Sequence, residues 1–554
     1  ASGGAATLNA DNGINVNGDF SSIGATSFNA DSDANGTGTF VVAGSVLING
    51  NISITANDID LAGTLSAGAS NITILVSDGG TIGLGNTAGD MTIDGTELQS
   101  MTAANLTIGS TANGNITVDG ITADNSDNLG TVTLNSGGDI NFSNNDSTFN
   151  ALTVNADASV NVSILTLRTD TGNLTLNADA DSTGGGDRIL LNYGFANVLS
   201  SVGDLTLNSG ASGVVANGAL SLFSSDGSVT VNSDVAVTND FSIQVGGAIN
   251  LNGNMTANSY MLFNADNGIN VNGNLTSGSS ITLRADLDIY GKPDVSNTLT
   301  FADGVIVNAG GRITFDDAST DVVALGDITL LAGSKVRIEG DFASSGNLEV
   351  IANGEVTSSG ALTIDGTTRI HASGYDVTLG NTANEFTGTV RVTGANVTLV
   401  DQSGIDLGAS TITGNFDLTA AGVVTQSGSL TVAGTTDVNA AGFDVFLDNF
   451  ANDLSGSVSV SGANVTLNDV NAIDLGVSTI SGNLDVTAGG NITDSGSIVV
   501  AGTSIFNTTV NGSNIILDNA ANAFLGSVTL QANSGAGTFG NITFVDSGSI
   551  NFSN

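Results

Sequence analysis

The chain has 554 residues with 53 acidic and nine basic side chains, which gives a formal net charge of −44 at pH 7. This charge disfavours nucleic acid and anionic membranes as partners, because both repel a strongly acidic surface. Cysteine is absent, which excludes disulfides and thiolate metal sites, and no apolar run approaches the ~18 residues that would predict membrane insertion.

Short alternating runs of Val, Ile, Leu and Thr, bounded by Gly, Asn, Asp and Ser, fill the sequence. Such runs are typical of strands joined by turns. The 75 glycines accompany a single proline, and glutamate occurs only five times, so residues that favour helices are scarce. We therefore expect an all-β chain with an apolar interior under a surface of Asn, Ser, Thr and Gly.

The N-terminal part, residues 1–325, repeats irregularly but reuses the same phrases. The nine residues from Ala10 to Gly18 return unchanged from Ala265 to Gly273. No linker composition separates this part from residues 326–554. We interpret the two parts as one continuous solenoid, in which each coil packs only on its neighbours.

Two segments interrupt the strand pattern. The first runs from Asp181 to Asp187 and contains a Ser-Thr-Gly-Gly-Gly turn. The second runs from Asp286 to Ser296 and contains Pro293, which cannot donate a hydrogen bond to an interior strand ladder. We predict that each segment forms a loop that leaves the coil.

Positive charge gathers in the middle of the chain. Seven of the nine cationic residues and the only histidine lie between residues 284 and 391: Arg284, Lys292, Arg312, Lys335, Arg337, Arg369, Arg391 and His371. One interpretation is that they offset nearby acids on the surface. The other is a contact patch for an acidic neighbouring subunit or a glycan, formed by Arg312, Lys335, Arg337, Arg369 and His371.

From about residue 326 onward the sequence repeats every 68 residues. The phrase Asn347-Leu348-Glu349-Val350 returns as Asn415-Phe416-Asp417-Leu418 and as Asn483-Leu484-Asp485-Val486. The third copy carries two additional residues between Thr503 and Gly512. About nine strand-like pieces fit one period, which predicts three coils of about 23 residues, three faces per coil and about 24 coils in a parallel β-helix.

Alternation within the repeated strands predicts which side chains face the core. The apolar residues should point inward: Leu348, Val350, Phe416, Leu418, Leu484 and Val486. The acids between them should point to solvent, namely Glu349, Asp417 and Asp485. Three coils would separate these acids by ~14 Å, beyond the ~8 Å screening length at physiological salt, so no metal ion is needed. Phenylalanines such as Phe386, Phe443 and Phe446 are predicted to stack in the core.

Carboxylate pairs are the main candidates for catalysis, because polysaccharide hydrolases require two of them, one protonated. Asp316, Asp317 and Asp321 lie close in sequence to Arg312. With 48 aspartates in short turns such clusters arise by chance, so we interpret them as turn residues. One histidine and no cysteine give no support to zinc sites or to Ser/His and Cys/His catalysis. We expect neither enzymatic activity nor a cofactor.

Three phrases of the repeats resemble large bacterial exoproteins of the filamentous-haemagglutinin type: Val392 to Leu399, Ser481 to Thr493 and Leu517 to Asn522. Those proteins are exported by two-partner secretion or as autotransporter passengers. The resemblance implies a right-handed parallel β-helix on a bacterial cell surface that serves adhesion, biofilm or sheath formation. The secretion domain of that family is not visible here, and residues 549–554 echo residues 139–144, so we expect a piece of a longer repeat array.

These observations lead to three hypotheses. The first is a non-enzymatic extracellular shaft of a surface fibre, filament or adhesin, whose partner is itself, stacked head to tail, with surface glycans or other cells as further partners. The alternative is a glycan-binding or polysaccharide-cleaving β-helix, which a groove with carboxylates beside Arg312 or Arg337 would favour. The third is an adhesin that binds Ca²⁺, although the segment from Gly184 to Asp187 matches only a fragment of the calcium-binding nonapeptide pattern.

Overall fold

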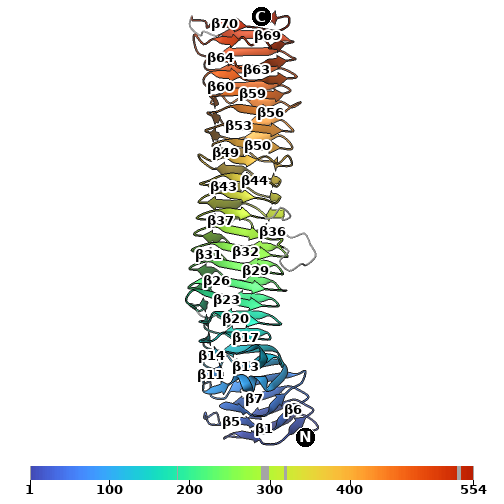
Figure 1. The fold of residues 1–554 in the computed structure, drawn as a ribbon, viewed down its shortest axis with the longest axis vertical. Helices are drawn as coiled ribbons and strands as arrows, with labels where there is room; N and C mark the ends of the chain where they lie inside the picture. The colour runs from blue at the N-terminus through green and yellow to red at the C-terminus, as the bar shows by residue number, and fades with distance from the viewer. Residues whose placement is uncertain (1, 184, 288–297, 317–320, 533–537, 553–554) are drawn as a thin grey trace. The chain divides into compact units, whose positions relative to one another are not determined.

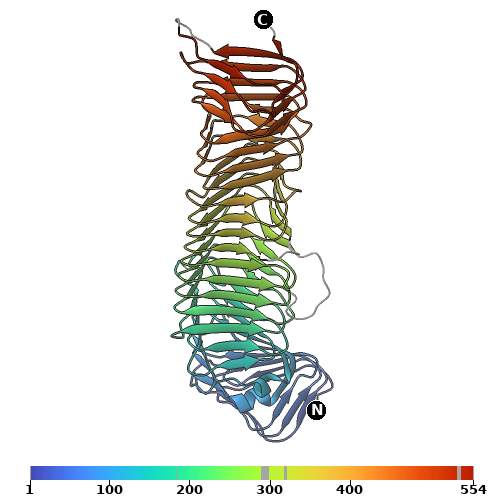
Figure 2. The ribbon, with the colours of Figure 1, turned by 45° about the horizontal axis from the view of Figure 1, so that its top comes forward.

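The chain is an all-β parallel β-solenoid of about 25 turns with almost no helix. The computed structural model describes residues 2–183, 185–287, 298–316, 321–532 and 538–552. They fall into two compact units: Ala1–Ser279 with Leu283–Asn297, and Ser280–Thr282 with Thr298–Asn554. Within each unit successive coils stack as parallel strands (Figures 1 and 2). The predicted fold class, with three faces per coil, is confirmed.

The later coils of the first unit show the three faces most regularly. Each coil contributes one strand to each of three columns, and each strand pairs in parallel with the corresponding strand of the next coil. The first column consists of β18 (Leu152–Ala156), β21 (Leu174–Ala178), β24 (Leu205–Asn208), β27 (Val229–Val231), β30 (Ile249–Leu251) and β33 (Ile269–Val271). The second consists of β16 (Ile140–Phe142), β19 (Val160–Val162), β22 (Ile189–Leu191), β25 (Val214–Ala216), β28 (Val235–Val237) and β31 (Met255–Ala257). The third consists of β17 (Ser147–Phe149), β20 (Thr166–Thr169), β23 (Ala196–Ser201), β26 (Ala219–Ser224), β29 (Phe241–Val245) and β32 (Met261–Ala265).

One long strand connects the first coils of this unit to the later ones. The ten residues of β13 (Met101–Ser110) pair with β9 (Thr64–Ser66) at their beginning and with β10 (Asn71–Val76) further along. Two columns of the early coils therefore merge into one. The short helices α1 (Gly95–Gln99) and α2 (Ala123–Ser126) lie on either side of β13 in the sequence.

A capping box holds α1 in place. The backbone N–H of Glu97 donates to Oδ1 of Asp94, and the N–H of Asp94 donates to Oε2 of Glu97, both at 2.8 Å. This reciprocal arrangement satisfies two amides at the start of the helix. The N–H of Leu61 also donates to Oε1 of Glu97, at 2.9 Å, which ties the helix to the neighbouring coil.

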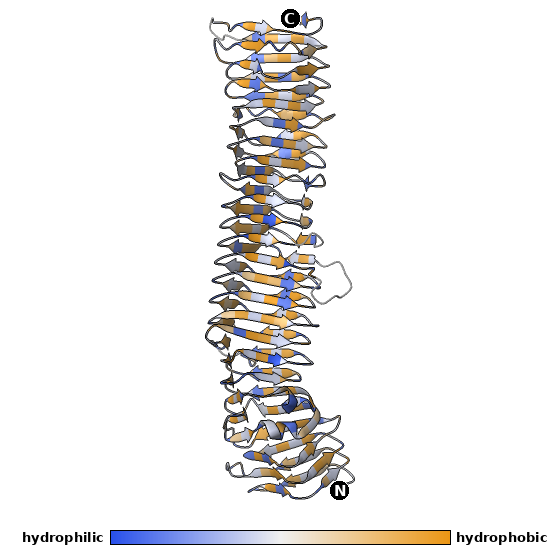
Figure 3. Ribbon diagram, in the orientation of Figure 1, coloured by the Kyte–Doolittle hydropathy of each residue, from blue (hydrophilic) through white to orange (hydrophobic). Residues whose placement is uncertain are grey.

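Apolar and polar residues alternate along the repeat strands (Figure 3), and burial alternates in the same way, as predicted. The predicted inward residues are all at most 3% exposed: Leu348, Val350, Phe416, Leu418, Leu484 and Val486. The three acids between them occupy the outward positions of their strands.

The prediction that the phenylalanines of the repeats stack in the core is only partly confirmed. Phe386 is buried, but Phe443 is 41% exposed. Phe446 is half-buried, because it occupies the outward middle position of β57 (Val445–Leu447). Phe443 lies in the turn before that strand, so neither contributes a fully buried ring.

Each repeat copy contains ten strands, not nine. The copies run from β40 (Ile328–Ala332) to β49 (Val390–Gly394), from β50 (Val397–Asp401) to β59 (Ser457–Gly462), and from β60 (Val465–Asp469) to β69 (Ser527–Ala532). One of the ten strands in each copy is only two residues long, such as β48 (Glu385–Phe386). Two residues are too few to show alternation in a sequence.

The coils of the repeat copies are also shorter than the predicted 23 residues. Leu348 of β43 (Leu348–Ala352) pairs with Thr368 of β46 (Thr368–His371), 20 positions further along the chain. Hydrogen bonds between adjacent coils commonly join residues 20 apart, as between Thr367 and Asn347. With ten strands and three strands per coil, one copy fills about three and a third coils.

Because of this additional third of a coil, equivalent strands of successive copies lie in different columns. The strand equivalent to β43 is β53 (Phe416–Ala420) in the second copy and β63 (Leu484–Ala488) in the third. In the coil made of β56 (Thr436–Asn439), β57 and β58 (Asp453–Leu454), β56 continues the column of β53 and β57 continues into that of β63. The column of β58 leads back to β43 through β55 (Leu430–Val432), β52 (Ser410–Ile412), β49 and β46. The outward acids of the three copies consequently lie in three columns, two of which meet at β49, so that β43 and β63 belong to one sheet and β53 to another.

Turns absorb the length differences between coils. Each copy has one glycine at the same place with a positive φ, which favours glycine: Gly374 at +81°, Gly442 at +90° and Gly512 at +79°. The two additional residues of the third copy lie between β66 (Ser504–Thr508) and Gly512. The pairing of β66 with both neighbouring strands is kept, so the insertion lengthens a turn.

The segment predicted to leave the coil from Asp181 to Asp187 connects β21 to β22, and its described residues are mostly exposed. Gly184 lies outside the described residues. The other predicted loop, from Asp286 to Ser296, lies outside them from residue 288 onward, including Pro293. Its form stays a prediction.

Candidate functional site

Three of the residues predicted to form a contact patch line one groove in the second unit. The groove has a volume of about 360 Å³. Its lining consists of Arg312, Lys335, Arg337, Glu355 and Thr357.

Strand stacking brings these residues together. The strands β38 (Ile313–Phe315), β41 (Val336–Ile338) and β44 (Val356–Ser358) pair in parallel in consecutive coils. The residues that precede these strands therefore lie in one row at the same corner. They are Arg312, Lys335 and Glu355. The outward middle positions of β41 and β44 form a second row next to it, with Arg337 and Thr357.

The cations of the groove are exposed, and the ion pairs that they form with neighbouring acids are weak. Nζ of Lys335 lies 2.6 Å from Oε2 of Glu355, and their side chains are 52% and 49% exposed. Arg337 forms an ion pair with Glu339. Within the described part of the chain, Arg312 takes part in no ion pair. Exposed ion pairs contribute about 0–1 kcal/mol, so an incoming anion can replace them at low cost.

A pair of carboxyl groups lies beside the groove. Asp316 follows β38 and Glu339 follows β41, one coil apart. The hydrogen bond to Asp316 and burial raise the pKa of Glu339, and the neighbouring Arg337 opposes this shift. A direct hydrogen bond places the two groups closer than the separations of about 5 Å or more that glycosidases use.

Of the other two candidate carboxylates, the described one, Asp321, does not join this pair. Asp321 begins β39 (Asp321–Ala324), which pairs with β36 (Thr298–Phe301) and β42 (Phe342–Ser344) in a different column. Asp317 lies outside the described residues. The proposed cluster of three is therefore not assembled from the residues that the structure describes.

The remaining two predicted contact residues lie on another face. Arg369 and His371 belong to β46, where Arg369 forms an ion pair with Glu349 and pairs in register with Arg391 of β49. The structure thus divides the five predicted residues into two groups. Sequence analysis missed Glu355 and Thr357, whose signal is their distance of 20 residues, one coil, from Lys335 and Arg337.

Buried asparagines hold the two-residue strands of the repeats. Asn384 is fully buried; its Oδ1 accepts from the N–H of Leu362 at 2.8 Å, and its Nδ2 donates to the carbonyl of Leu379 at 3.0 Å. The equivalent Asn452 and Asn522 accept from the corresponding amides at 2.9 Å. Each side chain replaces a backbone partner in a buried turn.

Buried aspartates do the same at the boundary between copies. The N–H of Phe386 donates to Oδ2 of Asp401 at 2.9 Å, and the N–H of Leu454 donates to Oδ2 of Asp469 at 2.7 Å. Burial raises the pKa of Asp469, although the hydrogen bonds from Leu454 and Asn471 oppose this. These carboxylates supply acceptors where a two-residue strand cannot pair fully with the next coil.

Side chains at the corners bind each coil to the next. Asp376 of the first copy and Asn396 and Asn415 of the second each accept, through Oδ1, a hydrogen bond from a backbone N–H one coil further on, at 3.0–3.1 Å. The same ladder recurs in the other copies. Its remaining members are Asp327 and Asn347 in the first copy, Asp444 in the second, and Asn464 and Asn483 in the third.

The first unit carries a longer ladder on its outer surface. In each step Nδ2 of one asparagine donates to Oδ1 of the asparagine one coil earlier, at 2.6–2.8 Å. The members are Asn135, Asn155, Asn177, Asn208, Asn232, Asn252 and Asn272. The abundance of asparagine in the sequence is thus explained by coil stacking.

In the described part of the chain, no group of three or more His, Cys, Asp or Glu side chains could hold a metal ion. The helices found among the described residues are also too short to cross a membrane.

Comparison with known families identifies the repeats and nothing beyond them. A family described as repeats of unknown function (DUF5649) matches residues 326–393, 394–461 and 462–531. These three matches reproduce the 68-residue period, with two additional residues in the third copy. No curated protein and no solved structure matches the chain.

Proposed function

We propose that the chain is an extracellular structural protein, the β-helical shaft of a bacterial surface fibre or adhesin. The observation that carries this proposal is that the recurring polar residues form hydrogen bonds between neighbouring coils. The corner ladders, the buried asparagines and the buried aspartates all bind one coil to the next. A solenoid held together in this way can be lengthened by further coils, because each coil depends only on its neighbours.

The location and the class of protein rest on the resemblance to filamentous-haemagglutinin-type exoproteins. That resemblance supports an extracellular position on a bacterial cell surface, without enzymatic activity and without a resident cofactor. The acidic, hydrogen-bonded surface supports it further, since net charge keeps extended β-proteins apart laterally.

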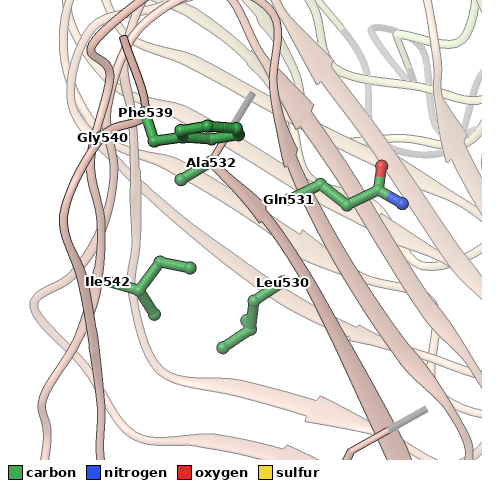
Figure 4. A pocket seen from close by; sticks show the side chains of 6 residues that line it. All are labelled: Leu530, Gln531, Ala532, Phe539, Gly540 and Ile542. Carbon is green, nitrogen blue, oxygen red and sulfur yellow. The ribbon is translucent and has the colours of Figure 1, made fainter. Parts of the chain in front are cut away.

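We also propose that the shaft stacks head to tail with itself. Around β70 (Ile542–Phe544) the side chains of Leu530, Phe539 and Ile542 surround an apolar pocket of about 480 Å³ (Figure 4). Phe539 is 76% exposed and Phe552 is 60% exposed. A second copy that packs against the strands beside this pocket would cover these residues.

Light scattering over a dilution series tests this stacking. We expect the apparent mass of the wild-type chain to grow with concentration, and the double variant Ile542→Asp and Phe552→Asp to stay monomeric. Phe450→Asp is the matched control, because Phe450 is 75% exposed but lies in a turn of the second copy. A monodisperse wild-type monomer at high concentration would contradict head-to-tail stacking.

Glycan binding is the second candidate, and one observation favours it: the groove that three cations line on an otherwise acidic chain.

A further inference from the structure

The cations of this chain are too few to be spread evenly, and three of them meet at one groove. The chain has nine cationic residues against 53 acidic ones. Three of the nine line the groove formed by Arg312, Lys335 and Arg337. Because three positive charges meet there on an otherwise acidic chain, this groove can attract an anionic ligand.

We propose that this groove binds an anionic sugar chain, one that carries carboxylate or sulfate groups. The inference goes beyond the shaft function, because a shaft needs no ligand site. Guanidinium groups bind carboxylate and sulfate oxygens with two parallel hydrogen bonds, so Arg312 and Arg337 supply the charge recognition. Lys335 adds a third positive charge between them.

The spacing of the groove suits a sugar polymer. Adjacent coils are about 4.8 Å apart and residues two positions apart on a strand are about 7 Å apart. Arg312 and Lys335 are related by the first spacing, and Lys335 and Arg337 by the second. The hydroxyl of Thr357 lies on the same lining and can bond a ring hydroxyl. The volume of about 360 Å³ is that of a small-ligand pocket, which fits one or two sugar rings.

Binding is favoured over cleavage by the carboxyl pair. Asp316 and Glu339 lie one coil apart and interact with each other, an arrangement that leaves no space between them for a glycosidic bond. A concave groove also fits a narrow chain better than it fits the outer face of a second solenoid. A copy of this acidic chain is nevertheless a competing occupant that the experiment must separate.

Glu355 sets the strength of binding. It holds Lys335 at 2.6 Å and repels an arriving anion. The variant Glu355→Gln removes that competition while keeping the size of the side chain. We expect it to bind the anionic sugar more tightly than the wild type does.

Calorimetric titration with defined oligosaccharides tests the proposal. An oligogalacturonate probes carboxylate recognition, a sulfated heparin-derived hexasaccharide probes sulfate recognition, and neutral dextran oligomers are the blank. We expect the double variant Arg312→Gln and Arg337→Gln to lose about tenfold or more in affinity. Arg369→Gln with Arg391→Gln is the matched control, because it removes the same charge from another face.

The proposal is supported if at least one anionic probe binds the wild-type chain at low salt. The affinity should then be lower in the groove variant, higher in Glu355→Gln and unchanged in the control variant. Binding that falls equally in the control would reduce the effect to overall charge and overturn the groove. Absence of binding by either anionic probe would overturn it as well. If the groove variant instead abolishes concentration-dependent association of the chain and no sugar binds, the groove is a contact between copies.

Discussion

At the scale of single residues, the recurring asparagines are structural parts of the turns. Asn384 accepts a hydrogen bond from one buried backbone group and donates one to another. Replacing it by alanine leaves both groups unsatisfied, at about 1–3 kcal/mol each. We therefore predict that Asn384→Ala destabilises its coil by about 2–6 kcal/mol.

Hydrogen exchange of the peptide that contains Leu362 measures this effect locally, which is needed because long repeat arrays do not unfold in one step. Thr382→Ala is the control, since Thr382 is exposed in the same turn and its loss should change exchange little. Equal exchange in the two variants would show that the buried amide contributes nothing.

The raised pKa values of two outward-facing, partly covered acids, the exposed Asp437 and the half-buried Asp485, make stability depend on pH. Burial, with repulsion from Asp417, raises the pKa of Asp437, and burial raises the pKa of Asp485, each above the 3.8 of the free side chain. A raised pKa in the folded state means that folding favours the protonated form. The resulting stabilisation is complete below pH 3.8 and is lost as the pH rises through the folded pKa.

We therefore predict that the melting temperature rises as the pH falls from about 7 to about 4. The double variant Asp437→Asn and Asp485→Asn should start from a higher melting temperature at neutral pH and show a smaller rise. Groups with lowered pKa act in the opposite direction only at lower pH, as for Asp90, whose pKa is lowered by hydrogen bonds from Thr81. A melting temperature that falls steadily between pH 7 and pH 4 would contradict this account.

At the scale of elements, the turns tolerate a change in length, whereas the strands do not tolerate a change in register. The third copy already carries two more residues in the turn before Gly512 than the second copy has before Gly442. Inserting Val-Asn between Ala441 and Gly442 should therefore cost less than about 1 kcal/mol, because loop closure depends weakly on length.

A single glycine inserted after Leu418, inside β53, provides the contrast. It moves the rest of the strand to the opposite face and should abolish the pairing of Thr419 with Asn439. Thermal unfolding and proteolysis of the two variants compare the effects. If both insertions destabilise equally, the coil has no preferred place for additional residues.

Strand direction and facing could be predicted from the sequence, because two-residue alternation is visible in strands of three to five residues such as Phe416–Ala420. The coil length could not, because Glu385–Phe386 and its equivalents have no alternation and are held by the buried Asn384 and Asp401. An Asn in a turn is ordinarily exposed, so the sequence does not indicate that Asn384 is buried. The groove could be predicted only in part. Its cations could be recognised because basic residues are rare in this chain, but Glu355 is recognised as a neighbour of Lys335 only once the coil length is known.

At the scale of the whole molecule, the additional third of a coil decides how the repeats present their surfaces. Equivalent outward residues such as Glu349, Asp417 and Asp485 belong to three different columns. Three copies together therefore distribute equivalent side chains over more than one sheet. Repeated acids do not form one continuous charged row, which limits their mutual repulsion.

The recurring residues contribute to stacking, and the groove of Arg312, Lys335 and Arg337 falls partly before the first matched copy and occurs once among the described residues. A shaft with a single binding groove would place its ligand at a fixed position along its length. Loss of sugar binding would leave the shaft proposal intact, and loss of stacking would leave the groove intact.

Electron microscopy of the native material, labelled with an antibody to this chain, tests the central claim most directly. The account predicts label along thin filaments outside the cell, with strand columns that continue from one copy to the next. Isolated particles, or label confined to the cell interior, would contradict it.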